Sequence, residues 1–175
     1  MARTPSRPAT AAARDRHAIE ASGIGGTIHL DQFDRAIIEA LQRDGRRPYG
    51  SIAEAVGLSE AAVRRRVQRL RDHDVLQIVA VTDPLQLGFN REALVGIRVH
   101  GDVRIVADKI ASIVEVNYVV MCAGSFDILA EVIAESDDSL LHLLNDSIRS
   151  IAGVTEVETF LYLKLAKQTF TWGTR

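Results

Sequence analysis

The chain has 175 residues, of which 47% are hydrophobic and 25% are charged, with a formal net charge of −2. This length fits one medium or two small domains, and the composition is ordinary for a soluble globular protein. No apolar run reaches the roughly 18 residues that a membrane-spanning helix requires. The single cysteine, Cys122, cannot form an internal disulfide or a thiolate metal site by itself. We therefore expect a cytoplasmic protein with no membrane association, no metal site and no cofactor.

The charges are unevenly distributed along the chain. Residues 1–82 hold 13 arginines, no lysine and 10 acidic residues, whereas residues 83–175 hold 8 basic and 13 acidic residues. The first half is therefore basic and uses arginine alone, the side chain best suited to bidentate contact with phosphate or guanine. The second half is acidic. This division predicts two domains with different partners.

Residues 1–29 are rich in Ala, Arg, Ser, Thr, Pro and Gly and show no sustained apolar period. This composition is typical of a disordered tail. An arginine-rich, acid-poor start also resembles an organellar transit peptide, and that alternative stays open.

Residues 30–82 show the pattern of a three-helix DNA-binding domain. Asp31 is a suitable N-cap for a first helix that ends at Asp44-Gly45, and Pro48 suits the first turn of a second helix. Gly57 then allows a tight left-handed turn, and Ser59 caps a third helix. Two short helices, a glycine turn and a third helix follow the helix-turn-helix plan.

The third helix carries five arginines and one apolar stripe. Val63, Val67 and Leu70 lie within about 60° of one another on a helical wheel, which predicts that they face the first two helices. The opposite face points to a DNA groove, and Arg66, beside the buried stripe, is a better candidate for a structural or phosphate contact than for base reading. The residues expected to contact DNA are Ser59, Ala61, Arg64, Arg65, Arg66, Gln68 and Arg69.

The segment 75–81 is apolar and rich in β-formers, which predicts a wing hairpin or an extension strand packed on the helices. Asp83-Pro84 ends it, and we expect residues 83–92 to form a linker.

Residues 93–175 read as a ferredoxin-like βαββαβ domain, so the fold class is α+β. Strands are expected over 93–99, 116–123, 128–134 and 155–165, and helices over 103–114 and from a cap at Ser136 to Gly153. The apolar stripe predicted for the second of these helices consists of Leu140, Leu141, Leu144, Ile148 and Ile151. Both helices would cover one face of the sheet. The other face carries Phe160 and Tyr162, which predicts that a second subunit covers it.

Over roughly residues 30–170 the chain resembles the Lrp/AsnC (feast/famine) family of prokaryotic transcription regulators. The landmarks of a winged helix-turn-helix that carry this resemblance are Leu30-Asp31, Asp34, Ile38, Leu41-Gln42, Gly45-Arg46, Ile52-Ala53, Gly57-Leu58-Ser59, Val63, Arg66-Val67 and Leu70. The sequence departs from the family pattern at Asp74, where a glycine usually follows the third helix, and at Pro48, which replaces a hydroxyl cap.

The resemblance implies a homodimer that often assembles into tetramers or octamers and binds pseudo-palindromic double-stranded DNA. It also implies a small-molecule effector, an amino acid or a related metabolite, near the turn formed by Gly124, Ser125, Phe126 and Asp127. Asp127 has two interpretations: it orients the effector's ammonium group, or it satisfies local backbone amides of the turn.

Two other functions remain as alternatives. The siroheme decarboxylases share this two-domain plan, but His73, His100 and His142 are scattered without metal-ligand spacing, so we expect no enzyme activity. The second alternative is a ligand-binding assembly protein that no longer reads DNA, and the arginine-rich helix argues against it.

Overall fold

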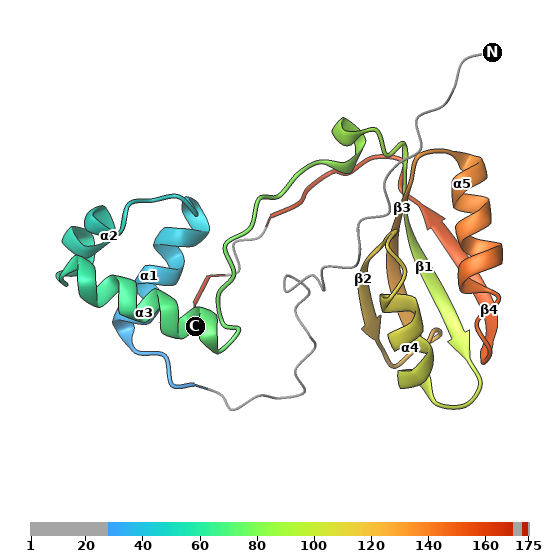
Figure 1. Cartoon of the computed structure of the whole chain (residues 1–175), viewed down its shortest axis with the longest axis horizontal. Helices are drawn as coiled ribbons and strands as arrows, with labels where there is room; N and C mark the ends of the chain where they lie inside the picture. Colours follow the sequence, from blue (N-terminus) through green and yellow to red (C-terminus); the bar gives the residue numbers. More distant parts are fainter. Residues whose placement is uncertain (1–27, 170–172, 175) are drawn as a thin grey trace, which may run out of the picture. The chain divides into compact units, whose positions relative to one another are not determined.

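The computed structural model describes residues 28–169, 173 and 174, which divide into two compact units (Figure 1). The first unit contains the described residues up to Val79 together with Gly173 and Thr174, and the second is Ala80–Thr169. The tail expected over residues 1–29 lies outside the described residues except for its last two, which adopt no regular structure.

The first unit contains α1 (Gln32–Arg43), α2 (Tyr49–Val56) and α3 (Glu60–Asp72). A capping box starts α1: the backbone N–H of Asp34 donates to Asp31 Oδ1 at 2.9 Å, and the N–H of Asp31 donates to Asp34 Oδ2 at 3.2 Å. Gly57, with φ 71°, ends α2 in the left-handed region, and Ser59 Oγ then accepts from the N–H of Ala62. The expected caps are confirmed, except that Pro48 occupies the N-cap of α2 rather than its first turn.

The apolar stripe of α3 packs against the first two helices as predicted. Val63, Val67 and Leu70 are at most 1% exposed. Two of them, Val63 and Val67, share one apolar cluster with Ile37 of α1 and Ile52 of α2. Burial of three aliphatic side chains, each contributing roughly 1.5–3 kcal/mol, fixes which face of α3 is turned to the core and which to solvent.

The C-terminus of α3 is closed by a Schellman motif. The N–H of Val75 donates to the carbonyl of Leu70 at 2.9 Å, and the N–H of Asp74 donates to that of Arg71 at 3.1 Å. Asp74 has φ 55°, which makes it the one non-glycine residue with positive φ in the described part of the chain. The left-handed turn therefore forms without the glycine that the family usually places here.

The wing expected over residues 75–81 is not formed as a strand. None of these residues pairs with a strand within the described chain, and Val75, Ile78, Val79 and Val81 are 40–59% exposed. Leu76 alone packs on the helical core. A strand needs a partner for its backbone groups, and the described residues of this single chain supply none.

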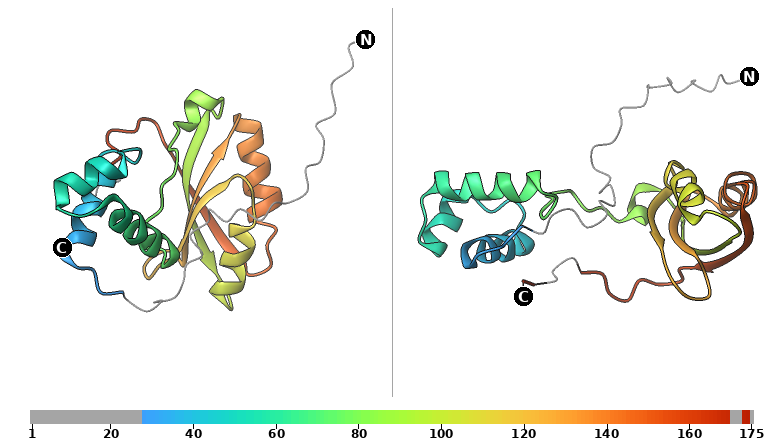
Figure 2. Two further views of the ribbon diagram at one scale, coloured as in Figure 1. Left: turned by 60° about the vertical axis from the view of Figure 1, so that its left-hand side comes forward. Right: turned by 90° about the horizontal axis from the view of Figure 1, so that it is seen from below.

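The second unit has the predicted βαββαβ order. Its elements are β1 (Arg91–Val99), α4 (Val103–Ala111), β2 (Val116–Met121), β3 (Ile128–Ala134), α5 (Asp137–His142) and β4 (Val154–Leu161). The four strands form one antiparallel sheet in the order β2-β3-β1-β4. Figure 2 shows α4 and α5 on one side of the curved sheet. A short 3-10 helix, η1 (Pro84–Leu87), precedes β1 within the predicted linker.

The apolar stripe predicted for the second helix of this unit is partly wrong. After α5 the helix continues as the π-helical segment η2 (Leu143–Ile148), in which each residue turns less than in an α-helix. The change in pitch moves the buried face away from Leu141, which is 56% exposed, toward Leu143, which is 5% exposed. Of the rest of the stripe, Leu140, Leu144 and Ile148 are buried as expected, and Ile151 is partly buried against the same core.

Several predicted element ends are also wrong. The strand β4 stops at Leu161, four residues earlier than predicted, and Leu163 is 93% exposed. Leu161 pairs with Ala93, close to the start of β1, so the partner strand ends almost where β4 does. The helix α4 ends at Ala111 and β2 at Met121, both short of the predicted ends, whereas β1 begins two residues earlier, at Arg91.

Candidate nucleic-acid interface and ligand turn

The solvent-facing side of α3 presents the residues expected to contact DNA. Ser59, Ala61, Arg64, Arg65, Gln68 and Arg69 are exposed, and Arg66 is half-buried beside the apolar stripe. The helical wheel therefore predicted correctly that Ala61, Arg64, Arg65, Gln68 and Arg69 face solvent and that Arg66 lies beside the buried stripe. What it could not give is the partner of each side chain.

Two side chains on this surface are held by their own helix. Arg64 Nη2 donates to Glu60 Oε1 at 2.9 Å, and its guanidinium also lies 5.3 Å from the ring centroid of Tyr49 on α2. Gln68 Nε2 donates to Asp72 Oδ1 at 2.7 Å. Both contacts are exposed, so water and phosphate compete with them at little cost.

Arg66 is fixed to the first turn of α1. Its Nη1 lies 2.8 Å from Asp31 Oδ2 and 2.8 Å from Asp34 Oδ1, and its guanidinium lies 5.4 Å from the ring centroid of Phe33. Hydrogen bonds to Asp34 and then to Asp31 raise the pKa of Arg66. The backbone N–H of Asp34, followed by Arg66, lowers the pKa of Asp31. The structural contact expected for Arg66 is therefore present.

Arg69 is also fixed, which sequence reasoning missed. Its Nη2 donates to Asp34 Oδ2, so one carboxylate accepts from two arginines of α3. Asp34 is completely buried, whereas the Arg69 side chain remains 45% exposed. By contrast, no hydrogen bond or ion pair involves the side chain of Arg65 within the described chain.

These arginines border a shallow hollow on the first unit. The hollow has a volume of about 340 Å³ and is lined by Asp31, Leu58, Ala62, Arg65, Arg66 and Arg69. Four charged side chains on its rim make it polar rather than a pocket for an apolar ligand. Its position along α3 coincides with the surface expected to face a DNA groove.

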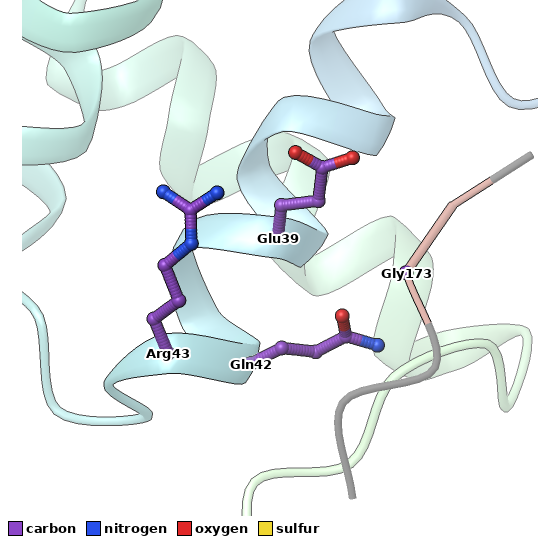
Figure 3. A pocket seen from close by; sticks show the side chains of 4 residues that line it. All are labelled: Glu39, Gln42, Arg43 and Gly173. Atoms are coloured by element: carbon purple, nitrogen blue, oxygen red, sulfur yellow. The ribbon is translucent and has the colours of Figure 1, made fainter.

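A second hollow in the same unit involves the end of the chain. Figure 3 shows Glu39, Gln42 and Arg43 of α1 around a space of about 230 Å³ that Gly173 closes on the other side. Thr174 Oγ1 donates to Glu39 Oε1 at 2.6 Å, so the described C-terminal residues contact α1. No local pattern predicts this contact, because it joins positions more than a hundred residues apart.

In the second unit, the predicted ligand turn is tied to β1 through Asp127. The backbone N–H of Asp127 donates to the carbonyl of Ile97 at 3.0 Å, and Asp127 Oδ2 accepts from the N–H of Val99 at 2.8 Å. The carbonyl of Asp127 accepts from the N–H of Cys122 at 2.9 Å. The Asp127 carboxylate therefore satisfies a backbone amide, but that amide belongs to Val99 of β1 and not to the turn itself. Its second carboxylate oxygen, Oδ1, has no hydrogen-bond partner in the described chain.

Phe126 lies on the face of the sheet that carries no helix. Its ring packs on the backbone of Gly96, where an added Cβ would stand 2.7 Å from ring atom Cδ2. The ring also meets Phe160 edge-on, with centroids 6.2 Å apart, and the Arg98 guanidinium lies 5.8 Å from its centroid. Gly124 and Ser125 are exposed beside it. The turn thus continues the aromatic surface of the open sheet face.

The same face holds an acidic cluster that the sequence did not reveal. Tyr162 Oη donates to Glu131 Oε1 at 2.9 Å. Burial, followed by that hydrogen bond, raises the pKa of Tyr162 to about 12, which keeps its hydroxyl a donor. Burial, followed by the charges of Glu131 and Asp83, raises the pKa of Glu92.

The three histidines considered for an enzyme site have different hydrogen-bond partners. His73 Nδ1 is 2.9 Å from the carbonyl of Arg69, His142 Nδ1 is 2.9 Å from Asp146 Oδ2, and the backbone N–H of His100 donates to Gly153. Within residues 28–169, 173 and 174, no three His, Cys, Asp or Glu side chains are grouped to hold a metal ion. No helix in that part of the chain is long and apolar enough to cross a membrane.

Two family models match the chain. Residues 30–71 match the AsnC-type helix-turn-helix domain, and residues 89–175 match the description "PF0864 C-terminal dimeric alpha+beta barrel domain". The HTH-type transcriptional regulator FL11 of Pyrococcus furiosus is 34% identical over 142 residues, which cover 80% of this chain and 93% of that one. FL11 of Pyrococcus horikoshii is 32% identical over 144 residues, covering 81% and 95%.

Solved structures agree with the sequence relatives. Escherichia coli AsnC superposes with a TM-score of 0.72 at 26% identity, covering 81% of this chain and 97% of AsnC. A Neisseria meningitidis transcriptional regulator, solved as a complex with L-Met, shares the fold with a TM-score of 0.72 at 24% identity, covering 81% and 95%. The two units, the helix-turn-helix geometry of α1 to α3 and these matches together show that the chain belongs to the Lrp/AsnC family of DNA-binding transcriptional regulators.

Proposed function

We propose that the protein binds a specific pseudo-palindromic operator as a homodimer, with α3 of each subunit in the major groove, and that an amino acid or related metabolite modulates this binding in the cytoplasm. The observation that carries the proposal is the solvent face of α3. It combines small Ala61 and Ala62 near the helix N-terminus with Arg65, whose side chain has no partner in the described chain.

We propose that the seven residues predicted at the N-cap and along α3 serve DNA binding in different ways. An outward-facing arginine that has no partner among the described residues is suited to the bidentate contact with guanine O6 and N7, which supports base reading by Arg65. Ser59, Arg64 and Gln68 lie in exposed, easily exchanged contacts, which supports contacts with phosphate or base edges. Arg66 and Arg69 are held by Asp34.

The open face of the sheet supports a homodimer. Phe160 and Tyr162 are 43% and 37% exposed on the side opposite the helices, and Phe126 extends this surface. An apolar face of a sheet is normally covered by other parts of the protein or by another subunit, and a second copy of this chain would cover this face. The family description of the second unit as a dimeric barrel points the same way. Assembly into tetramers or octamers rests on family membership alone.

The turn at Gly124–Asp127 supports an effector site. One carboxylate oxygen of Asp127 accepts a hydrogen bond from the N–H of Val99. The other has no partner in the described chain and is available to accept a hydrogen bond from an ammonium group. A regulator with the same fold was solved with L-Met, so the fold accommodates an amino acid. The effector class proposed here is therefore a molecule with a free amino group.

The DNA-binding part is tested by selecting an operator from random duplexes and measuring affinity for it and for a scrambled duplex. The proposal expects an enriched two-fold sequence with half-sites about 10–10.5 bp apart, or a multiple of that spacing, and a specificity ratio of at least about 10³. Equal affinity for both duplexes would mean that the protein does not read sequence. Sedimentation in the same buffer should give a dimer or a multiple of a dimer.

A further inference from the structure

The first turn of α1 is joined to α3 by ion pairs as well as by apolar packing. Asp34 is the one fully buried charged residue in the described chain, and its carboxylate accepts from Arg66, from Arg69 and from the N–H of Asp31. A buried carboxylate is stable only when its oxygens are paired in this way. The two arginines are therefore bound to a group that water cannot reach.

This pairing changes how much positive charge α3 offers to DNA. The helix has five arginines, Arg64, Arg65, Arg66, Arg69 and Arg71. Arg66 and Arg69 share the buried charge of Asp34, and Arg66 also shares that of Asp31, whereas the partner of Arg64 is exposed and screened by water. Arg69 stays on the hollow beside Arg65 with nearly half of its side chain exposed. Without Asp34 it would be free to contact any phosphate.

We propose that Asp34 is a positioning and specificity-determining residue. It holds Arg66 and Arg69 against α1, fixes the orientation of α3 and withholds both charges from sequence-independent contact with phosphate. The proposal rests on DNA reading by α3 as proposed above. Phosphate contacts raise the affinity for every DNA sequence alike. By preventing such contacts, Asp34 raises the ratio of operator affinity to affinity for other DNA.

The test measures affinity for the operator and for a scrambled duplex over a range of salt in the full-length protein, with three variants. Each phosphate contact contributes about −0.9 to the slope of log K against log salt for duplex DNA. Asp34→Asn keeps the side-chain shape and removes the charge. It should steepen the slope on scrambled DNA by about 0.9 per subunit, as a released arginine would, and lower the specificity ratio about tenfold or more.

Arg69→Gln and Arg65→Gln form the matched pair, since each removes one charge from the same face of α3. Arg69→Gln should leave the slope on scrambled DNA almost unchanged, because that charge already belongs to Asp34. Arg65→Gln should weaken operator binding about tenfold or more, the scale of a lost guanine contact. If Arg69→Gln flattens the slope by about 0.9 per subunit, Arg69 contacts phosphate and the proposal is wrong. An unchanged slope in folded Asp34→Asn also overturns it.

Circular dichroism melts show whether each variant is folded. If Asp34→Asn does not fold, the comparison of Arg69→Gln with Arg65→Gln decides the question alone. In Arg69→Gln both oxygens of Asp34 keep a partner, Arg66 on Oδ1 and the N–H of Asp31 on Oδ2. Failure of the DNA-reading proposal has a different signature: the unmodified protein itself would show no preference for an operator.

Discussion

The ring of Phe126 lies directly against Gly96, so close that a Cβ on Gly96 would stand 2.7 Å from ring atom Cδ2. This relationship links the ligand turn to the central strand β1 and brings the ring within 6.2 Å of Phe160. A single missing methyl group therefore determines where the turn lies on the open sheet face.

Gly96→Ala should destabilise the protein by about 1–3 kcal/mol, the usual scale for an added group in a packed site, because the ring must move. Urea unfolding measures the change in the free energy of unfolding. Gly50→Ala is the control, since its Cβ would meet only the flexible end of Glu60 at 3.4 Å, within a helix. There alanine should stabilise by about 0.5–1 kcal/mol. Equal effects at the two sites would contradict the close contact at Gly96.

Asp74→Gly should stabilise the first unit by about 0.5–1 kcal/mol, because Asp74 adopts φ 55° and glycine adopts that conformation without a Cβ penalty. Asp74→Ala should shift stability in the opposite direction. Thermal unfolding of the two variants, measured side by side, checks the sign. A melting temperature lower for Asp74→Gly than for Asp74→Ala would contradict the left-handed backbone conformation as the cause of the difference.

The raised pKa of Glu92 makes part of the stability of the second unit dependent on pH. Because the folded-state pKa lies above the unfolded value, this contribution is fully present below about pH 4 and is lost as pH rises through the folded pKa. Glu92→Gln removes the charge, so the variant should be more stable than the parent at neutral pH and similar to it at about pH 4. Urea titrations at both pH values measure the difference.

Glu54→Gln is the matched control for this titration, since Glu54 is exposed on α2 and the change removes the same charge. A stability gain at neutral pH in both variants would point to general charge repulsion and not to burial of Glu92 beside Glu131.

Asp127 is tested with two substitutions that separate its two roles. Asp127→Asn keeps an oxygen to accept from the N–H of Val99 but loses the charge, whereas Asp127→Ala loses both. Once a thermal-shift screen of amino acids finds an effector, Asn should retain the melting temperature of the parent and lose most of the ligand-induced shift. Alanine should lose both.

Asp108→Ala, at an exposed position of α4, controls for removal of a surface carboxylate. If Asp127→Asn binds the effector as tightly as the parent does, the carboxylate serves only the turn.

Much of the fold was predictable because local signals agree with the tertiary structure. Asp31, Gly57 and Ser59 mark helix ends through backbone geometry, and the spacing of Val63, Val67 and Leu70 identifies the buried face of α3. The alternation of side chains along β4 likewise predicted that Phe160 lies on the face of the sheet that the helices do not cover. These are properties of a few neighbouring residues, so a sequence contains them directly.

The errors arose where the outcome depends on distant residues. A helical wheel gives the direction of Arg69 but not its pairing with Asp34, which lies 35 positions away. The end of β4 depends on where β1 begins, and burial of Leu143 in place of Leu141 depends on a change of helical pitch. The contact of Phe126 with Gly96 likewise joins positions far apart in the chain.

If α3 reads DNA through its outer face, the affinity of Arg65→Ala for the selected operator must fall. Arg104→Ala is the control, because it removes the same charge from α4, in the second unit. Arg65→Ala should weaken operator binding by about 1–3 kcal/mol, while Arg104→Ala should bind like the parent. Parent-like operator affinity in a folded Arg65→Ala protein, or an equal loss in both variants, would mean that α3 does not read the operator through Arg65.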